Sequence, residues 1–563
     1  MRTPHLASAW KLFLAVPLAL TLALAVLSGP AEARTVTVNC GHRHTIGHAL
    51  KSSVKHLAII VKGACVENVE IERDDVTITT DGVTPASITA ADASKPVITL
   101  DGAQRIVIDG LLAGGLTLSG GTFGVSASRT STLDLQNCTV SGNSANGVVA
   151  SYGSTVGIDS CTVGPNMGNG VVAANTSSVA ITNSTVSNNT GAGILAVRSS
   201  YIRVGQDLAG TTTVKPVNVS ASGGNGIAIT ESSSGNVVGG VVDGSVSTNI
   251  FVGRGSSGQI GLGSNNLMGG VVIQNGATHG IFVEGGNATI VFSAISGNGL
   301  TGISVSNAGS ARIGILNTST GYGPTTVSNN GQVGIQVAIG GAAFVGGTTI
   351  SGNGNGGGGG AFGRFGISVV QGSATLAGDN VITNNGESGI FVGRGGSINV
   401  GDGAFGLTTT NTISGNGSVG PNNGGLFAFQ GGIIQVFNGT ISGNTGPAVQ
   451  SFEAGVIELR GSTAVTVPAA GSTAGAVVQF GATLRVRDTA SIVSGTGDGI
   501  QASNMTAVNI RDGNTIQGKG AGSVGIRCFN VSSTAPASAA TLNGNLAGVS
   551  GTAGSTTGCN VFP

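Results

Sequence analysis

A short phrase recurs through most of this 563-residue chain and sets the strongest limit on its fold. The phrase is Thr, Val or Ile, Ser, a variable residue and Asn, followed a few residues later by Gly-Ile or Gly-Val. The first element begins at Thr139, Thr185, Thr326, Thr349, Thr412 and Thr440, and the second at Gly147, Gly170, Gly193, Gly280, Gly302 and Gly389. A period of about two dozen residues is typical of a solenoid in which each repeat forms one turn.

Within each repeat, apolar residues alternate with polar or small ones, as in Leu133-Asp134-Leu135 and Val156-Gly157-Ile158. This period of two indicates strands with one buried face. Short strands repeated at one spacing satisfy their backbone hydrogen bonds by stacking on the equivalent strand of the next turn, ~4.8 Å away. Because the composition does not shift between residues 100 and 530, we expect one repeat array rather than a string of domains.

The Asn of the repeat forms a column of its own, for which two reasons can be given. Asn tolerates the left-handed conformation of a tight corner, and its amide can hydrogen-bond to the amide of the next turn. We therefore predict a structural asparagine ladder. Its members are Asn143, Asn166, Asn189, Asn298, Asn330, Asn353, Asn385, Asn416 and Asn444.

These repeats resemble the right-handed parallel β-helix repeats of the pectin-lyase-like superfamily, over roughly residues 60 to 530. The resemblance implies an all-β fold, a single-stranded right-handed parallel β-helix. It does not imply one function, since lyases, hydrolases, epimerases, adhesins and phage tailspikes share this fold.

The two ends of the chain differ from the repeats. Basic residues, an apolar run from Leu12 to Leu27 and a small-residue site at Ala31-Glu32-Ala33 predict a secretory signal peptide over residues 1–33. A membrane-spanning anchor is the alternative, but Pro17 interrupts the run, which is shorter than the ~20 apolar residues that a bilayer crossing needs. We expect a secreted protein, extracellular or periplasmic. The expected parts after the signal peptide are an N-terminal cap (34–60), the β-helix (61–530) and a C-terminal cap (531–563).

A short amphipathic helix is expected in the N-terminal cap, from Thr45 to His56. It lies between Cys40 and Cys65, in an arrangement similar to the cap of many secreted β-helices. The six cysteines form three local pairs, which in an exported chain favours three disulfides: Cys40–Cys65, Cys138–Cys161 and Cys528–Cys559. For Cys138 and Cys161, which occupy the same position in consecutive turns, the alternative is two buried thiols.

Catalytic motifs of enzymes with this fold are missing. The chain has no Trp-Ile-Asp-His, Arg-x-Pro-x-x-Arg, Asn-Thr-Asp, Asp-Pro-His or Gly-Gly-x-Gly-x-Asp segment. His44 and His48 have helical spacing for a shared metal, but no third ligand matches them. The acidic residues between 110 and 500 are scattered over distant turns, so we expect few of them to meet. No catalytic residue, metal or cofactor is predicted.

The charge balance limits the partners. The chain has 24 basic and 24 acidic residues and no basic stripe, which argues against nucleic acid. Only 9% of residues are charged, against ~25% in typical soluble domains. No membrane insertion of the repeat region is expected.

Two features depart from the plain repeat. The fourth residue after each repeat Ile or Val forms a column that includes Arg198, Glu231 and Arg254 in successive turns. The hexapeptide Ile250–Gly255 also recurs unchanged as Ile390–Gly395. We interpret the column as an ion-pair stack on a solvated face, with a ligand-binding ladder as the alternative. The candidate binding residues of this column are Tyr152, Arg198, Glu231, Arg254 and Arg394.

Longer turns form the second feature. Extra residues enter at one place in the repeat, in the segments 205–215, 261–270, 314–324 and 401–410. Loops on a rigid scaffold often carry function, and these are rich in Gly, Thr and Asn. We therefore predict a secreted, non-catalytic interaction protein with a polysaccharide or cell-envelope partner. The alternative is a polysaccharide lyase or glycoside hydrolase, implied only by the resemblance of fold.

Overall fold

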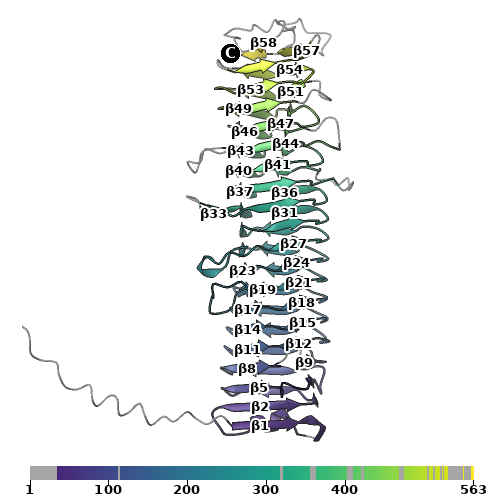
Figure 1. Cartoon of the computed structure of the whole chain (residues 1–563), viewed down its shortest axis with the longest axis vertical. Coiled ribbons are helices and arrows are strands. Elements are labelled where there is room, and N and C mark those ends of the chain that lie inside the picture. The colour runs from purple at the N-terminus through teal and green to yellow at the C-terminus, as the bar shows by residue number, and fades with distance from the viewer. Residues whose placement is uncertain are drawn as a thin grey trace, which may run out of the picture.

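The chain winds into one long column of stacked turns, seen side-on in Figure 1 of the computed structural model. The structure describes residues 34–562 except 43, 112–114, 318–320, 356–362, 402–409, 420–423, 468–473, 504–505, 511–513, 520–522, 524, 530–548 and 551–559. Three parallel sheets run along the column, with 20, 19 and 18 strands among these residues. We call them sheets A, B and C. The predicted fold, a right-handed parallel β-helix of the pectin-lyase-like type, is confirmed.

One turn shows how the repeat builds the three sheets. Its strands are β12 (Cys138–Val140) in sheet B, β13 (Val148–Ala150) in sheet C and β14 (Thr155–Asp159) in sheet A. Sheet A runs from β1 (Arg34–Asn39) to β59 (Asn560–Phe562), sheet B from β3 (Ala64–Val66) to β58 (Val549–Ser550), and sheet C from β4 (Val69–Ile71) to β57 (Ile526–Phe529).

The apolar residues that alternate in the sequence are the buried residues of the strands. In β11 (Thr132–Gln136) and β14, every second residue points into the core, and equivalent residues stack in register along the column. One such core row contains Ile78, Ile108, Leu135, Ile158 and Ile181. Each of these side chains is at most 1% exposed, so each contributes roughly 1.5–3 kcal/mol of hydrophobic stabilisation.

The asparagine ladder is confirmed in two runs. Asn143, Asn166 and Asn189 are linked by side-chain hydrogen bonds of 2.9 and 3.0 Å. A second run passes from Asn298 through Asn330, Asn353, Asn385 and Asn416 to Asn444, with bonds of 2.9–3.0 Å. Ser222 and Ser245 replace Asn between the two runs.

The predicted backbone conformation of the ladder was wrong. None of the nine Asn residues has a positive φ. The left-handed residue is the one before the ladder Asn in most turns, for example Gly142 (φ 67°), Asn329 (φ 53°) and Gly352 (φ 67°). The ladder residue is selected by its buried amide, and the tight corner is made by its neighbour.

The N-terminal helix is shorter than predicted. Helix α1 covers Ile46–Leu50, after the 3-10 turn η1 (Cys40–His42), and buries Ile46 and Ala49 against the first strands. The Arg73 guanidinium donates to the carbonyls of Ser52 and Val54, which a longer helix would use for its own hydrogen bonds. The helix therefore ends at Leu50 and does not reach His56.

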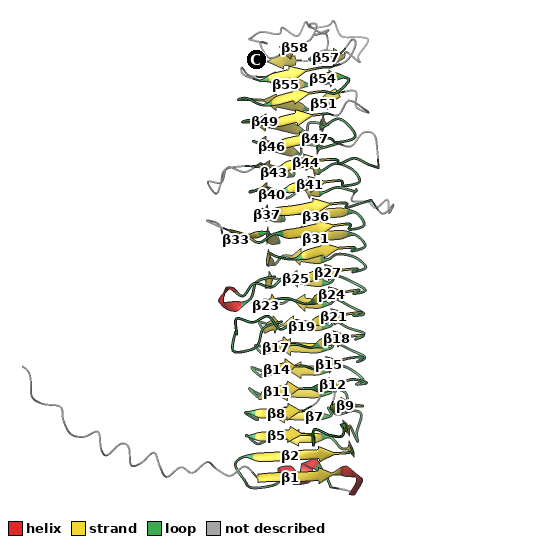
Figure 2. Cartoon of the chain, viewed as in Figure 1, coloured by secondary structure: helices red, strands yellow, loops and turns green. Residues whose placement is uncertain are grey.

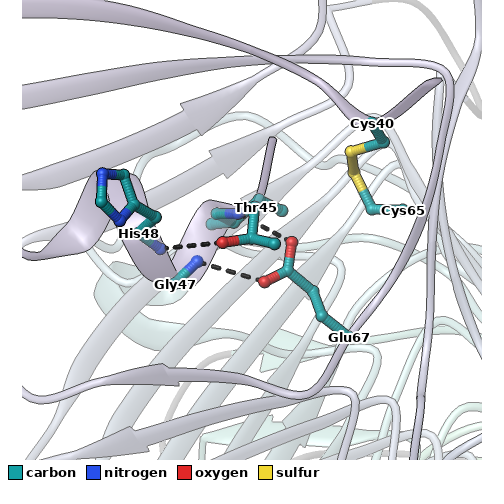
Figure 3. The surroundings of a disulfide bond; sticks show 7 residues. Cys40, Thr45, Gly47, His48, Cys65 and Glu67 are labelled. Atoms are coloured by element: carbon teal, nitrogen blue, oxygen red, sulfur yellow. Dashed lines mark hydrogen bonds between the residues drawn. A yellow bond between two sulfur atoms is a disulfide. The ribbon is translucent and has the colours of Figure 1, made fainter. Parts of the chain in front are cut away.

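The first predicted disulfide is confirmed. Cys40 and Cys65 are bonded, with their Cα atoms 5.0 Å apart (Figure 3). Beside them, the Glu67 carboxylate accepts from the backbone N–H groups of Ile46 (2.7 Å) and Gly47 (3.1 Å) at the start of α1. The disulfide and Glu67 together attach α1 to the first turns.

The Cys138–Cys161 disulfide was predicted wrongly, because both residues are free, buried thiols. In-register neighbours of a parallel sheet project their side chains side by side, ~4.8 Å apart, whereas a disulfide needs Cβ atoms ~3.8 Å apart and turned toward each other. Each thiol instead contacts the carbonyl oxygen two residues before it, on Gln136 (3.0 Å) and Asp159 (3.2 Å). The Cys528–Cys559 pair and the predicted signal peptide lie outside the described residues and side chains.

Within the described ranges, no helix is long and apolar enough to span a bilayer. Two of the long turns project from one side of the column near β17 (Ser178–Thr182) and β23 (Ser234–Val237), and the second contains the short helix η2 (Ser264–Asn266; Figure 2). They leave sheet A after β20 (Tyr201–Val204) and β26 (Ser257–Ile260), at the same corner of the solenoid.

Candidate functional site

The predicted binding column lies at the corner where sheet C passes into sheet A. Its residues have left-handed backbones, with φ of 52° at Tyr152, 56° at Arg198, 55° at Glu231, 52° at Arg254 and 51° at Arg394. The corner turns the side chains outward, and Tyr152 is 65% exposed. The repeat position is therefore a tight, solvated corner.

Three of the five column residues meet. Arg198 Nε lies 3.7 Å from Glu231 Oε2, and Arg254 Nη1 lies 3.2 Å from Glu231 Oε1. The two arginine side chains are 67% and 71% exposed, so solvent screens both pairs. Tyr152 and Arg394 lie on other turns, and Arg394 makes no ion pair with a described residue. The predicted ion-pair stack is present, and a binding role for the column stays a prediction.

We expect Arg254→Ala to lower the free energy of unfolding by less than ~1 kcal/mol, because an exposed ion pair contributes little. Thermal unfolding of wild type and variant provides the measurement. A loss of several kcal/mol would show that the corner stack is a structural element rather than a solvated surface.

The long turns form a connected structure beside sheet A. Gln206 of the first turn donates to the Ser264 carbonyl (3.0 Å) and accepts from the Ser264 N–H (2.9 Å). Asn265 donates to the Gly210 carbonyl (2.9 Å). The turns 205–215 and 261–270 are thus held together although a full turn of the solenoid separates them. Most of the segment 401–410 lies outside the described residues.

A cleft of about 340 Å³ lies between the turn 205–215 and the outer face of sheet A. Its floor is formed by β11, β14 and β17 (Ser178–Thr182), and Leu208 and Ala209 form part of its wall. Gly157 and Ala180 occupy equivalent outward positions in β14 and β17, so the floor is low at this point. Three carboxylates and one amine line the cleft, from Asp134, Asp159, Asp207 and Lys215.

Few of the scattered acidic residues were expected to meet, and these three line one cleft. Asp134 and Asp159 come from adjacent strands, on which Asp134 pairs with Gly157 and Gln136 pairs with Asp159. Asp207 joins them because its turn folds back over earlier strands. The available signal was a long turn that follows two repeats with small outward residues, Gly157 and Ala180.

Asp134 is the least compensated carboxylate of the cleft. Its Oδ1 lies over Gly157, where a Cβ atom would approach it to 2.7 Å. No described residue donates a hydrogen bond or an ion pair to it. Asp134 as a residue is exposed to solvent, but the protein around its carboxyl partly desolvates it and raises its pKa above the ordinary value. The cleft therefore holds a hydrogen-bonding group that the protein itself leaves unused.

The other two carboxylates are satisfied within the protein. Asp159 Oδ1 accepts from Thr182 (2.5 Å) and Asn183 (2.8 Å), and its Oδ2 accepts from Ser160 (2.9 Å). Desolvation is the largest single influence on the pKa of Asp159 and raises it, but these bonds and the Lys215 charge together lower the pKa.

Asp207 forms an ion pair with Lys215, at 3.1 Å. It also accepts from the backbone and side chain of Thr211, at 3.1 and 3.0 Å. Desolvation opposes these contacts, which together lower the pKa of Asp207. The ion pair and the two hydrogen bonds fix the wall of the cleft.

The pKa of Asp159 is lowered and that of Asp134 is raised, so replacing these two residues should have opposite effects on stability. We expect Asp159→Asn to destabilise the fold by about 1 kcal/mol, because an amide has one acceptor oxygen where the carboxylate has two. This contribution is present above the ordinary carboxyl pKa near ~4 and is lost as pH falls through the lower pKa of the folded state.

Asp134→Asn should leave stability unchanged or raise it at neutral pH, because the folded state disfavours the ionised Asp134. The advantage of this variant should vanish below pH ~4, where Asp134 is protonated. Thermal melts of both variants between pH 3 and 8 provide the measurement. Equal destabilisation by both at pH 7 would contradict this assignment.

Comparison with solved structures finds similar proteins at low identity. The alginate lyase from Paenibacillus sp. str. FPU-7 is 17% identical, over 62% of this chain and 94% of that chain, with a TM-score of 0.25. The mannuronan C-5 epimerase AlgE4 A-module of Azotobacter vinelandii is 11% identical, over 86% and 99%, with a TM-score of 0.28. The Siphovirus 9NA tailspike receptor binding domain is 10% identical, over 89% and 77%, with a TM-score of 0.17.

These similarities are too low to carry a functional argument. No curated protein matches the chain. The family model described as "Right handed beta helix region" matches residues 76–257 and 260–405, more than half of the chain. The protein therefore belongs to the right-handed β-helix family.

Proposed function

We propose that this protein is an exported, non-catalytic binding protein that holds an extended, uncharged polysaccharide in the cleft beside sheet A. The observation that supports this most is the cleft itself, in which Asp134 has no partner within the described protein. A carboxylate with free lone pairs accepts hydrogen bonds from neighbouring hydroxyl groups, of which a sugar ring carries several.

The charges of the cleft favour a neutral glycan over a uronate polymer. Lys215 is neutralised by Asp207, so Asp134 and Asp159 leave the cleft with an excess of negative charge. This excess repels the carboxylates of a polyuronate. Gln136 and Thr182 add neutral polar groups to the same lining.

The scaffold suits an extended partner. The three sheets form a straight column (Figure 1), and the cleft lies on the outer face of sheet A. The hydrogen bonds between the turns 205–215 and 261–270 fix the cleft wall before a ligand arrives, which reduces the entropy lost on binding. Export rests on the predicted signal peptide at residues 1–33. A cell-envelope polysaccharide is therefore the expected partner.

Retention on a panel of insoluble neutral and anionic polysaccharides tests the proposal. We expect retention on at least one neutral glycan, about tenfold weaker retention of Asp134→Ala, and none on polyuronates. The matched control is the Arg198→Ala, Arg254→Ala double variant, which removes two exposed side chains outside the cleft. If the control variant loses retention and Asp134→Ala keeps it, the binding site is the corner column and not the cleft. Equal retention by all three proteins would dismiss both sites.

A further inference from the structure

A row of phenylalanines lies on the outer face of sheet C and at its two edges in the second half of the column. We call it the aromatic stripe. Its members are Phe365, Phe391, Phe427, Phe429, Phe452 and Phe480. Phe365, which precedes the strand Ile367–Val370, is buried, and Phe480 lies at the corner after the strand Ala474–Gln479. Neighbouring rings lie with their centroids 4.5–6.3 Å apart; Phe427 and Phe429 belong to one strand, and the other contacts join successive turns. Phe480 is 54% exposed, and Phe391, Phe427, Phe429 and Phe452 are half-buried.

The recurring hexapeptide explains how such a ring lies on the sheet. In Ile390–Gly395, Ile390 and Val392 point into the core, and Phe391 points outward. The Phe391 ring lies over Gly393, where a Cβ atom would approach its Cζ to 3.0 Å. In the first copy, Phe251 covers Gly253 in the same way, but among the described residues its ring contacts only that of Phe282.

The corner beside the stripe carries two charged residues that form no ion pair with any described residue. Arg394 follows β42 (Ile390–Gly393), and Glu453 follows β48 (Val449–Phe452), with β45 (Leu426–Phe429) and Gln430 between them. Glu453 accepts from Gln430 at 3.1 Å and forms no ion pair with a described residue. Arg254, the equivalent of Arg394 in the first hexapeptide, is already paired with Glu231.

We propose that the aromatic stripe is the contact face of an antiparallel homodimer, in which Arg394 of each copy pairs with Glu453 of the other. A twofold axis parallel to the strands and level with β45 reverses the direction of the second column. It places the turn of β42 opposite the turn of β48, while Phe427 and Phe429 face their own copies. Such an interface is isologous, with each contact made twice.

The size of the stripe predicts a weak dimer. Five turns at ~4.8 Å and four-residue strands at ~3.3 Å per residue give a face of roughly 300 Å². A stable interface buries about 800 Å² on each partner, so the stripe alone supports a concentration-dependent association. This inference is independent of the proposed polysaccharide binding, because the cleft lies on sheet A and at earlier turns.

Sedimentation equilibrium over a range of concentrations tests the dimer. We expect the purified chain to dimerise, and Arg394→Glu or Glu453→Arg to weaken the association about tenfold through like-charge repulsion. The double variant Arg394→Glu, Glu453→Arg should restore it, because the pair is then reversed. The matched control Arg254→Glu changes the same residue of the identical hexapeptide and should leave association unchanged.

Three results would overturn the proposal. They are a wild-type chain that stays monomeric at its highest soluble concentration, single reversals that leave association unchanged, and a double variant that fails to regain it. Thermal melts of each variant confirm that the surface changes leave the fold intact. Polysaccharide retention of Glu453→Arg should equal that of wild type, so failure of the dimer is distinguishable from failure of the cleft.

Discussion

Asn353→Ala is expected to destabilise the turns around residue 353 by about 3 kcal/mol or more. The Asn353 side chain is fully buried and accepts from the Asn330 backbone (3.1 Å) and side chain (2.9 Å). It donates to Val327 O (3.1 Å) and Asn385 Oδ1 (2.9 Å). Alanine leaves several of these groups buried without partners, and each such group costs about 1–3 kcal/mol.

Hydrogen exchange of the amides in β35 (Thr325–Ser328), β38 (Thr348–Ser351) and β41 (Val381–Thr383) measures this effect locally. Local measurement is needed because a long repeat array does not unfold in two states. The matched control is Asn329→Gly, which changes an exposed Asn with φ of 53° to a residue that accepts this conformation. Comparable loss of protection in both variants would show that the ladder amides contribute no special stability.

Removal of the Cys40–Cys65 disulfide is expected to cost about 3 kcal/mol at the N-terminal end. The bond closes a loop of 25 residues, and the loss of chain entropy in the unfolded state then favours folding by about this amount. The effect should be confined to β1, α1 and the first turns. Reductant should therefore speed the hydrogen exchange of residues 34–71 and leave the later turns unchanged.

The free thiols provide a control for the disulfide. A Cys138→Ala, Cys161→Ala variant should keep the full response to reductant, because these residues are not bonded to each other. A variant that loses part of the response would contradict the assignment of two free thiols. Mass spectrometry after alkylation of the denatured, unreduced chain counts them directly.

The repeat predicts the fold well because most turns carry the same residue types at the same positions. Val and Ile at alternate positions, an Asn at the same corner and the Gly before the next Ile recur often enough that the stacking partner of each strand is fixed. The ladder from Asn298 to Asn444 could therefore be named before the structure was known. The Cys40–Cys65 pair could be named because it belongs to a recognisable cap arrangement.

The wrong predictions depend on side-chain directions and on contacts between distant residues, which the repeat pattern does not specify. Cys138 and Cys161 share a register position, but register does not tell whether two Cβ atoms point at each other. The cleft was not predicted because Asp207 lines it together with Asp159 only when the turn 205–215 folds back over earlier strands. Helix α1 ends early because Arg73, more than twenty residues later, binds the carbonyls of the following segment.

The aromatic stripe was also missed, although the recurring hexapeptide pointed to it. Its rings come from separate turns, and their contact depends on Gly393 leaving room for Phe391. The charges of the corner column could be aligned from the sequence, and the alignment of Arg198, Glu231 and Arg254 was correct. Which of these charges stay unpaired could be seen only in the structure.

We expect the cleft to bind a polysaccharide without cleaving it. The most direct test incubates the purified chain with the glycan that retains it and measures new reducing ends and unsaturated products over time. We predict retention with no product above the level of a protein-free control. Product that accumulates with wild type and disappears with Asp134→Asn would contradict the claim and show a lyase or glycoside hydrolase.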